Sequence, residues 1–319
     1  MKRYTLLLVA LLLCITTIEA KAKPKREATP KQTSIYVGSY NLWAARARDW
    51  KITRQGAGPE ARLWENAAHI VAQSIADNGF DICGTQECDF RVRELLPELL
   101  KKTKGGKNYK IWWGLADPEN PENSSANGVI YRADRFKILG GRVVWLSETP
   151  DIKSTGWDEK RHIRTASFLK VLDKRSKQPF YFIVTHIPLK PKAKEMSAGV
   201  IIEHEKKFNT EGLISILVGD MNARQEMSYS AHIREHFDDA YLIADKRCGT
   251  QGTFTGSAQN EANFTRPDRR IDYIYIHADD KSRYKVHSYE VIRKKYKHKD
   301  GNEYFPSDHC AIGANIIIK

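Results

Sequence analysis

The sequence predicts an α/β fold in which helices cover β-sheets within one layered domain. Short runs rich in β-branched and aromatic residues alternate with amphipathic stretches of helical spacing. Several strand-like runs follow each other late in the chain, which favours antiparallel neighbours over a simple doubly wound sheet. The length of 319 residues, with 41% apolar residues, is sufficient for one large domain with a sizeable core.

The N-terminus has the pattern of a secretory signal. Two basic residues precede an apolar run over 6–15, and small residues follow at Ala20 and Ala22. This pattern predicts a signal peptide over 1–22, cleaved after Ala20 or Ala22, and export to the periplasm or the extracellular space. The apolar run is too short to span a hydrocarbon core of ~30 Å comfortably. No later segment is long and apolar enough to do so, so we expect no transmembrane segment after signal removal.

The folded domain is expected at 34–319. Residues 23–33 are charged, contain proline and lack apolar periodicity, which predicts a flexible linker. The run SIYVGSYNLW, from Ser34, is typical of a strand. Residues 60–78 place apolar side chains at helical spacing, and Asn78 and Gly79 end this helix. The run FDICGTQE then predicts a buried strand over 80–87.

The later elements follow from the same criteria. Helices are expected at 91–102, 194–208 and near 225–236. Strands are expected at 109–113, 128–131, 136–146, 165–172, 180–185, 214–220, 271–276, 285–291 and 311–318.

Charge and cysteine content limit the partners. The formal net charge of +13 favours polyanions or anionic surfaces. After signal removal four cysteines remain, and one disulfide among them is left open. No CxxC or Cys/His spacing indicates a zinc site. Nothing in the sequence implies a stable protein partner.

Acids, amides and histidines recur at strand ends. A single acid there is usually a cap or a turn residue, but six separated segments indicate a shared site. The residues are Asn41, Glu87, His186, Asp220 with Asn222, Asp272, and Asp308 with His309. Carboxylate and amide oxygens are ligands for a hard cation such as Mg²⁺. A carboxylate or histidine can activate water, and amide or imidazolium groups can stabilise charge on a phosphoryl oxygen.

These segments resemble a known superfamily. The motifs Y-N-L-W (40–43), Q-E (86–87), T-H (185–186), G-D-M-N-A (219–223), R-I-D-Y-I (270–274) and S-D-H (307–309) appear in the order of the endonuclease/exonuclease/phosphatase superfamily. The G-D-x-N motif together with S-D-H is the specific part. The resemblance implies a four-layer α/β sandwich, with two packed, mostly antiparallel mixed sheets flanked by helices, and a Mg²⁺ or Mn²⁺ cofactor.

The resemblance also implies roles on the metal side. Glu87 is expected to be the principal metal ligand, with Asn41 and Asp308 nearby. Arg270 is a candidate contact to a substrate phosphate, although pairing with a neighbouring acid is an equal alternative.

On the catalytic side, the resemblance implies that Asp220 orients or deprotonates the attacking water and that Asn222 contacts the phosphate. Asp272 is expected to hold His309 in its cationic form. His186 is expected to contact the phosphate or the leaving group.

Two departures weaken an assignment to DNA cleavage. In the pancreatic-type deoxyribonucleases a glutamate partners the first histidine, but Asn127 stands near that place here. Cys88 and Asp89 follow Glu87, where those enzymes have an arginine for the minor groove. His186 therefore lacks its usual carboxylate partner, whereas the residues for metal-dependent phosphoester hydrolysis are all present.

The sequence thus predicts a secreted, metal-dependent hydrolase of phosphate esters. Nucleic acid is the favoured substrate because of the net charge. A sphingomyelinase-like enzyme and an inositol- or sugar-phosphate phosphatase are the alternatives. From another class, a catalytically inactive binding module on the same fold is the rival, although it would have no physical need for the whole residue set.

Overall fold

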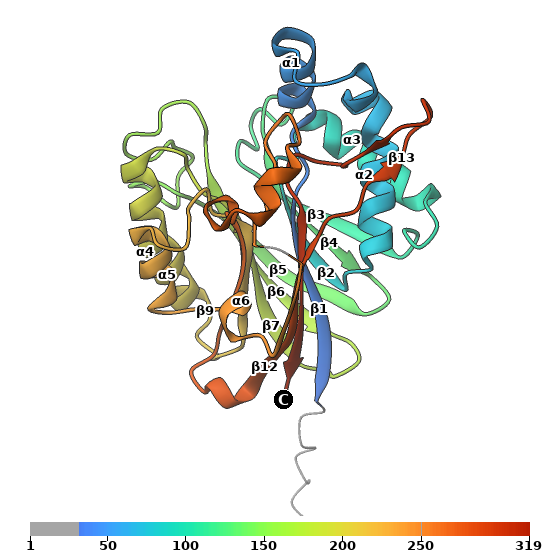
Figure 1. Cartoon of the computed structure of the whole chain (residues 1–319). Coiled ribbons are helices and arrows are strands. Elements are labelled where there is room, and N and C mark those ends of the chain that lie inside the picture. The colour runs from blue at the N-terminus through green and yellow to red at the C-terminus, as the bar shows by residue number, and fades with distance from the viewer. Residues whose placement is uncertain (1–31, 250) are drawn as a thin grey trace, which may run out of the picture.

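The computed structural model describes residues 32–249 and 251–319. Two β-sheets lie face to face in the middle of the molecule, and helices cover both outer faces (Figure 1). This arrangement confirms the predicted four-layer α/β sandwich. The predicted signal peptide, and the predicted linker up to residue 31, lie outside the described residues.

The first sheet, as far as the structure describes the chain, has seven strands in the order β10-β12-β15-β1-β2-β4-β3. They are β1 (Thr33–Asn41), β2 (Ile82–Gln86), β3 (Tyr109–Leu115), β4 (Ala126–Arg132), β10 (Lys246–Cys248), β12 (Tyr284–Ile292) and β15 (Ala311–Ile318). β1 runs parallel to β2 and antiparallel to β15. The C-terminal end of β1 therefore lies at the same edge as the end of β2 and the start of β15.

The second sheet has six strands in the described residues, in the order β5-β6-β7-β8-β11-β9. They are β5 (Phe136–Trp145), β6 (Thr165–Asp173), β7 (Pro179–His186), β8 (Ser215–Asp220), β9 (Asp238–Asp239) and β11 (Asp272–His277). His186 pairs with Asp220 across the parallel strands β7 and β8, and Asp272 pairs with Asp220 across the antiparallel strands β8 and β11. Pairing alone thus brings three predicted site residues to one edge.

Helices cover the outer face of each sheet. α1 (Ala45–Gln55), α2 (Trp64–Asn78) and α3 (Phe90–Lys102) lie on the side of the first sheet, and α4 (Pro191–Phe208) and α5 (Ser228–Arg234) lie on the side of the second (Figure 1). The shorter elements are η1 (Glu60–Arg62), α6 (Ala240–Ile243), η2 (Glu261–Thr265), η3 (Pro267–Arg269), η4 (Lys281–Arg283), β13 (Tyr296–Lys297) and β14 (Glu303–Tyr304). None of the described helices has the length and apolar character needed to span a membrane.

The core has three layers because side chains alternate across each strand. On β1, Ile35 and Val37 belong to the cluster between the sheets, whereas Tyr40 belongs to the cluster under α2 and α3. Gly84 on β2 permits a close approach of the two sheets. A Cβ atom at this position would lie 2.3 Å from a methyl carbon of Val218 and 2.8 Å from one of Val184.

The differences from the expected elements have local causes. β1 begins at Thr33, one residue before the expected start of the domain. α1 was not predicted because its apolar periodicity is weak, with only Ala45, Arg48 and Ile52 buried. The expected helix over 60–78 is divided into η1 and α2, and the helix expected near 225–236 is limited to α5. The four cysteines of the described residues are free, and only Cys248 is exposed.

Candidate active site

Asp220 lies at the centre of the predicted site. Its Oδ2 atom accepts a hydrogen bond from Asn41 Nδ2 at 3.0 Å, and lies 3.3 Å from His186 Nε2 and 3.7 Å from His309 Nε2. Its Oδ1 atom accepts a hydrogen bond from the backbone N–H of Asn222 at 2.9 Å. These contacts join residues of both sheets around one carboxylate that is 2% exposed.

His309 is held between two carboxylates. Its Nδ1–H donates to Asp272 Oδ2 at 2.9 Å, and the Thr253 hydroxyl donates to the same oxygen at 2.6 Å. Burial alone would lower the pKa of His309, but the negative charges of Asp272 and Asp220 outweigh it and raise the pKa to about 10. His309 is therefore a cation at neutral pH, with Nε2–H facing Asp220.

Asp220 has the opposite balance. Burial disfavours its charged form, and the resulting pKa is raised to about 7 although the His309 cation opposes the increase. A carboxylate with a pKa near neutrality can accept a proton from water at physiological pH. The position of Asp220 thus suits a general base.

His186 contacts an arginine that no motif in the sequence indicates. The Nη1 atom of Arg164, the residue just before β6, lies 2.6 Å from His186 Nδ1. A guanidinium can only donate, so Nδ1 is the acceptor and Nε2 carries the hydrogen that faces Asp220. Burial lowers the pKa of His186 well below its usual value, and the charges of Arg164 and His309 lower it further. His186 is therefore neutral.

Asn127 does not replace the missing carboxylate. Its amide donates to the backbone oxygen of Thr165 at 2.8 Å and to the Thr165 hydroxyl at 3.1 Å. His186, for which a carboxylate partner is expected, thus has the guanidinium of Arg164 beside it. The sequence offers little signal for this exchange, since an arginine before a strand is common.

Glu87 and Asp308 form the predicted metal side. Glu87 accepts hydrogen bonds from the backbone N–H of Ala44 at 2.9 Å and from Asn41 Nδ2 at 3.3 Å. Burial raises the pKa of Asp308, and the charge of Glu87 adds to the increase although the His309 cation opposes it. The nearest ion-pair partner of Asp308 is Lys51 at 3.9 Å. Asp308 is buried and Glu87 is partly buried, and the oxygen atoms of these two mutually repelling carboxylates suit a hard cation.

A second group at this edge has its ligand atoms at the spacing of a metal site. One ligand atom from each of Asp220, Asp272 and His309 lies within 4.8 Å of the others. Since the charged form of His309 carries a hydrogen on both ring nitrogens, it has no lone pair for a metal. The donor chemistry therefore favours Glu87 and Asp308 as the metal ligands.

Asn222 lies at this edge too. Its Nδ2 donates to the backbone oxygen of Ile187 at 3.0 Å, which uses one of its two amide hydrogens. Asn222, Glu87 and Trp43 are non-glycine residues with positive φ angles of 45°, 60° and 59°. Such backbone conformations cost about 1–3 kcal/mol each and are common at functional sites.

Arg270 is not part of this group. Its Nη2 atom donates to both carboxylate oxygens of Asp239, at 2.6 and 2.7 Å, and its Nη1 atom donates to Gln225 Oε1 at 3.0 Å. The side chain is 2% exposed. This is the pairing that the sequence left as the alternative. A contact with a substrate phosphate would require this buried ion pair to break.

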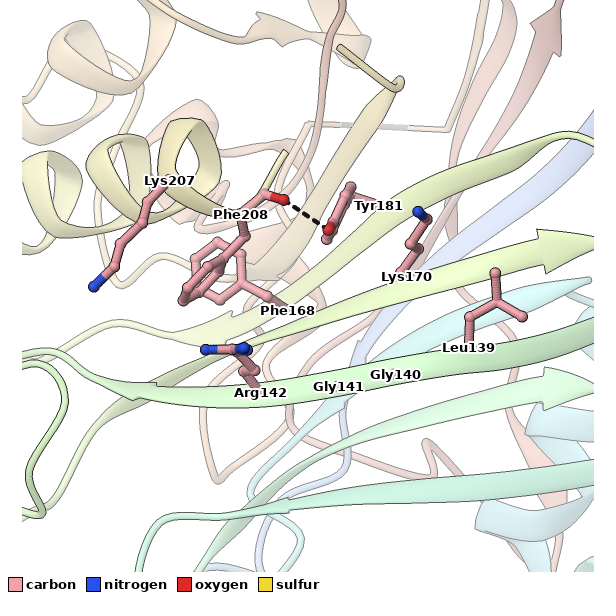
Figure 2. Close-up of a pocket in the computed structure, with 9 residues that line it drawn as sticks. All are labelled: Leu139, Gly140, Gly141, Arg142, Phe168, Lys170, Tyr181, Lys207 and Phe208. Atoms are coloured by element: carbon pink, nitrogen blue, oxygen red, sulfur yellow. Dashed lines mark hydrogen bonds between the residues drawn. The ribbon is translucent and has the colours of Figure 1, made fainter. Parts of the chain in front are cut away.

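An opening in the protein surface lies away from the predicted site residues. It has a volume of about 500 Å³ and lies over β5, β6 and β7 beside the end of α4, with Arg142, Lys170 and Phe208 among its lining side chains (Figure 2). None of the predicted site residues and no carboxylate lines it. Its size therefore does not identify the place of the chemistry.

The two packed sheets and the acid–histidine group at their shared edge define a phosphoesterase-type hydrolase fold. The chain belongs to the endonuclease/exonuclease/phosphatase family, whose model matches residues 38–309. Members of this family are hydrolases that act on phosphate esters.

Three relatives are similar over most of their length. A family protein of Bacteroides thetaiotaomicron is 27% identical, with a TM-score of 0.77 over 91% of this chain and 99% of that one. A mannosyl-6-phosphatase of the same organism is also 27% identical, with a TM-score of 0.76 over 88% and 99%. An uncharacterised protein of Acanthamoeba polyphaga mimivirus is 23% identical over 257 residues, which are 78% of this chain and 90% of that protein.

Proposed function

We propose that the chain is an exported, divalent-metal-dependent phosphoesterase that hydrolyses phosphomonoesters, with sugar phosphates as the substrate class. The observation that supports hydrolysis most strongly is the position of Asp220. Its carboxylate contacts Asn41, His186 and His309 at once, and its pKa near 7 allows it to accept a proton.

In this proposal Asp220 removes a proton from the water that attacks the phosphorus. His309 presents Nε2–H to the phosphoryl oxygens, and its positive charge stabilises the negative charge that develops on them. Asp272 fixes the orientation of the imidazole through Nδ1 and keeps it protonated. Asn222 offers its remaining amide hydrogen at the same edge.

Glu87 and Asp308 are the residues that would hold Mg²⁺ or Mn²⁺. When bound, such an ion neutralises phosphate charge and polarises the ester. Asn41 donates to both Glu87 and Asp220, so it fixes the distance between the metal side and the base.

Arg164 favours monoesters over diesters. A phosphomonoester carries up to two negative charges, whereas a diester carries one. Arg164 adds a cation beside His186, so this side of the site attracts the more highly charged phosphomonoester. The neutral His186 is a poor acid for a leaving group. The 27% identity to a mannosyl-6-phosphatase supports the same substrate class.

A nucleic-acid phosphodiesterase is the second candidate, because the net charge of +13 favours a polyanion. The sequence alone placed this substrate first. Arg164, which only the structure reveals, moves the monoester ahead of it.

The test is a substrate panel with purified full-length protein. We expect Mg²⁺-dependent hydrolysis of p-nitrophenyl phosphate and mannose 6-phosphate, abolished by EDTA, and slower turnover of bis(p-nitrophenyl) phosphate and plasmid DNA. Asp220→Ala is the inactive control. Faster turnover of DNA than of both monoesters would reverse the order of the two candidates. Export is tested separately by the mass of the protein outside the cell, which should lack 1–20 or 1–22.

A further inference from the structure

β8 and β11 carry a polar cluster at each end. Asp220 and Asp272 pair at the end that holds the candidate active site, and Ser215 pairs with His277 at the other end. Five residues separate the two ends along each strand, a distance of about 17 Å at ~3.4 Å per residue. The second cluster is therefore too far away to take part in the chemistry at Asp220.

The second cluster has three metal-type donors from different parts of the chain. Glu205 lies on α4, His236 follows α5 and His277 ends β11. One ligand atom from each lies within 4.8 Å of the others. Glu205 Oε2 is 2.8 Å from His236 Nε2, and the two imidazole rings are stacked with centroids 3.8 Å apart. Asp279 supplies a second carboxylate and a fourth donor, 3.6 Å from His277 Nε2.

Outer hydrogen bonds orient two of these donors. His277 Nδ1–H donates to the backbone oxygen of His236 at 2.7 Å, so the lone pair of His277 is on Nε2, which faces the cluster. Glu205 Oε1 accepts from the hydroxyl of Ser215 at 2.6 Å and from the amide of Asn209 at 2.8 Å, which leaves Oε2 toward the histidines. Metal-binding residues in proteins typically have such outer partners.

The donor side chains of the second cluster are mostly buried, but they line an opening that an ion can enter. The side chain of Glu205 is 3% exposed, while those of His236 and His277 are 13% and 16% exposed. The three residues and Asp279 line an opening of about 300 Å³. Two imidazoles with carboxylates suit a transition metal such as Zn²⁺, whereas Mg²⁺ prefers oxygen donors alone.

We propose that Glu205, His236 and His277 bind Zn²⁺, with Asp279 as the fourth ligand of a tetrahedral site. The metal takes the place of the proton shared between Glu205 and His236. The planes of the two stacked imidazole rings differ by only 25°, so their lone pairs lie side by side. The ring of His236 must therefore turn to direct its lone pair at the ion. It has the freedom to turn, since its Nδ1 forms no hydrogen bond within the described part of the chain.

Metal binding is tested on the full-length protein after chelator treatment, in excess Mg²⁺. The protein is titrated with Zn²⁺ against a chromogenic competitor. We expect one Zn²⁺ to bind to the wild type, and at least about 100-fold weaker binding by His277→Ala and Glu205→Gln, because loss of an outer partner alone costs 10- to 100-fold. Co²⁺ should give the intense visible absorption of a tetrahedral site, absent from both variants.

His287→Ala is the matched control, since His287 is a half-exposed histidine on β12 that is paired with Asp245, away from the cluster. It should bind Zn²⁺ as the wild type does. If His277→Ala does not fold, His236→Gln, which keeps a hydrogen-bond donor for Glu205, is the ligand variant to test instead. Equal Zn²⁺ affinity in the wild type and the ligand variants would overturn the proposal, as would the absence of any Zn²⁺ binding. Turnover of phosphate esters is not the readout, so failure here leaves the proposed function untouched.

Discussion

The two sides of the candidate active site differ in how they use a histidine. His309 and His186 are both buried, come from different sheets and direct Nε2 at the same oxygen of Asp220. The neighbour at Nδ1 is Asp272 for His309 and Arg164 for His186. The pKa of His309 is raised to about 10, whereas that of His186 is lowered well below its usual value. Burial lowers the pKa of both imidazoles; the charges of Asp272 and Asp220 outweigh it at His309, whereas the charge of Arg164 adds to it at His186.

Both sides therefore present positive charge to a substrate, but by different groups. On the His309 side the positive charge is on the imidazole, and on the His186 side it is on the guanidinium of Arg164. The same substitution at both histidines should then have unequal effects.

The largest loss is expected for His309→Gln. The amide retains a donor but cannot carry the positive charge, so kcat should fall at least about 100-fold. Initial rates with p-nitrophenyl phosphate at saturating Mg²⁺ measure it, with His287→Gln as the control. A loss below tenfold in a folded variant would show that the charge of His309 is dispensable.

The activity of the wild type should depend on pH through both groups. Asp220 must be ionised, so activity should rise as the pH increases through about 7 and be ~100-fold below its maximum at pH 5. His309 must be protonated, so activity should fall as the pH increases through about 10. A kcat/KM profile from pH 5 to 11 measures both limbs. A profile with no loss at low pH would contradict the role of Asp220 as the base.

Asp272→Asn should reduce kcat about 10- to 100-fold, because a hydrogen bond to a charged group is replaced by a neutral one. Removal of the carboxylate also lowers the pKa of His309, so the alkaline limb should move to lower pH. A merely structural role of Asp272 would reduce the rate without moving this limb. Circular dichroism checks that the fold is retained.

Arg164→Glu should reduce kcat/KM for monoesters about tenfold, because it exchanges a cation for an anion beside the phosphate. The same change places a carboxylate at Nδ1 of His186 and raises the pKa of this histidine. Diester turnover should fall less than monoester turnover, or increase. The ratio of rates with p-nitrophenyl phosphate and bis(p-nitrophenyl) phosphate measures the shift. Arg164→Lys, which keeps the charge, should retain the wild-type preference.

The smallest effect is expected for His186→Gln. A neutral imidazole and an amide offer equivalent donors, so the rate should fall only about threefold. The pH profile should not change. If His186→Gln instead lost as much activity as His309→Gln, the two sides would not differ in charge, and the assignment of a neutral His186 would be wrong.

The strand-like and helical runs were sufficient to predict one layered α/β domain, whereas the four-layer sandwich was implied by the resemblance to the superfamily. The recurrence of acids, amides and histidines at strand ends predicted a shared site, and the observed strand pairing places Asp220, His186 and Asp272 at one edge. Arg164 escaped prediction because its contact with His186 depends on how the segment before β6 packs. For the same reason no sequence pattern indicated the cluster at Glu205, whose members are each ordinary in their local context.

Gly84 and the valines that face it show how closely the sheets must dock before the site exists. Asp220 and His186 come from the second sheet, whereas Asn41, Glu87 and His309 come from the first. During refolding, a chain with complete secondary structure but undocked sheets would have no turnover. The return of enzymatic activity should therefore lag behind the far-ultraviolet signal, and would serve as a specific reporter of the docking step.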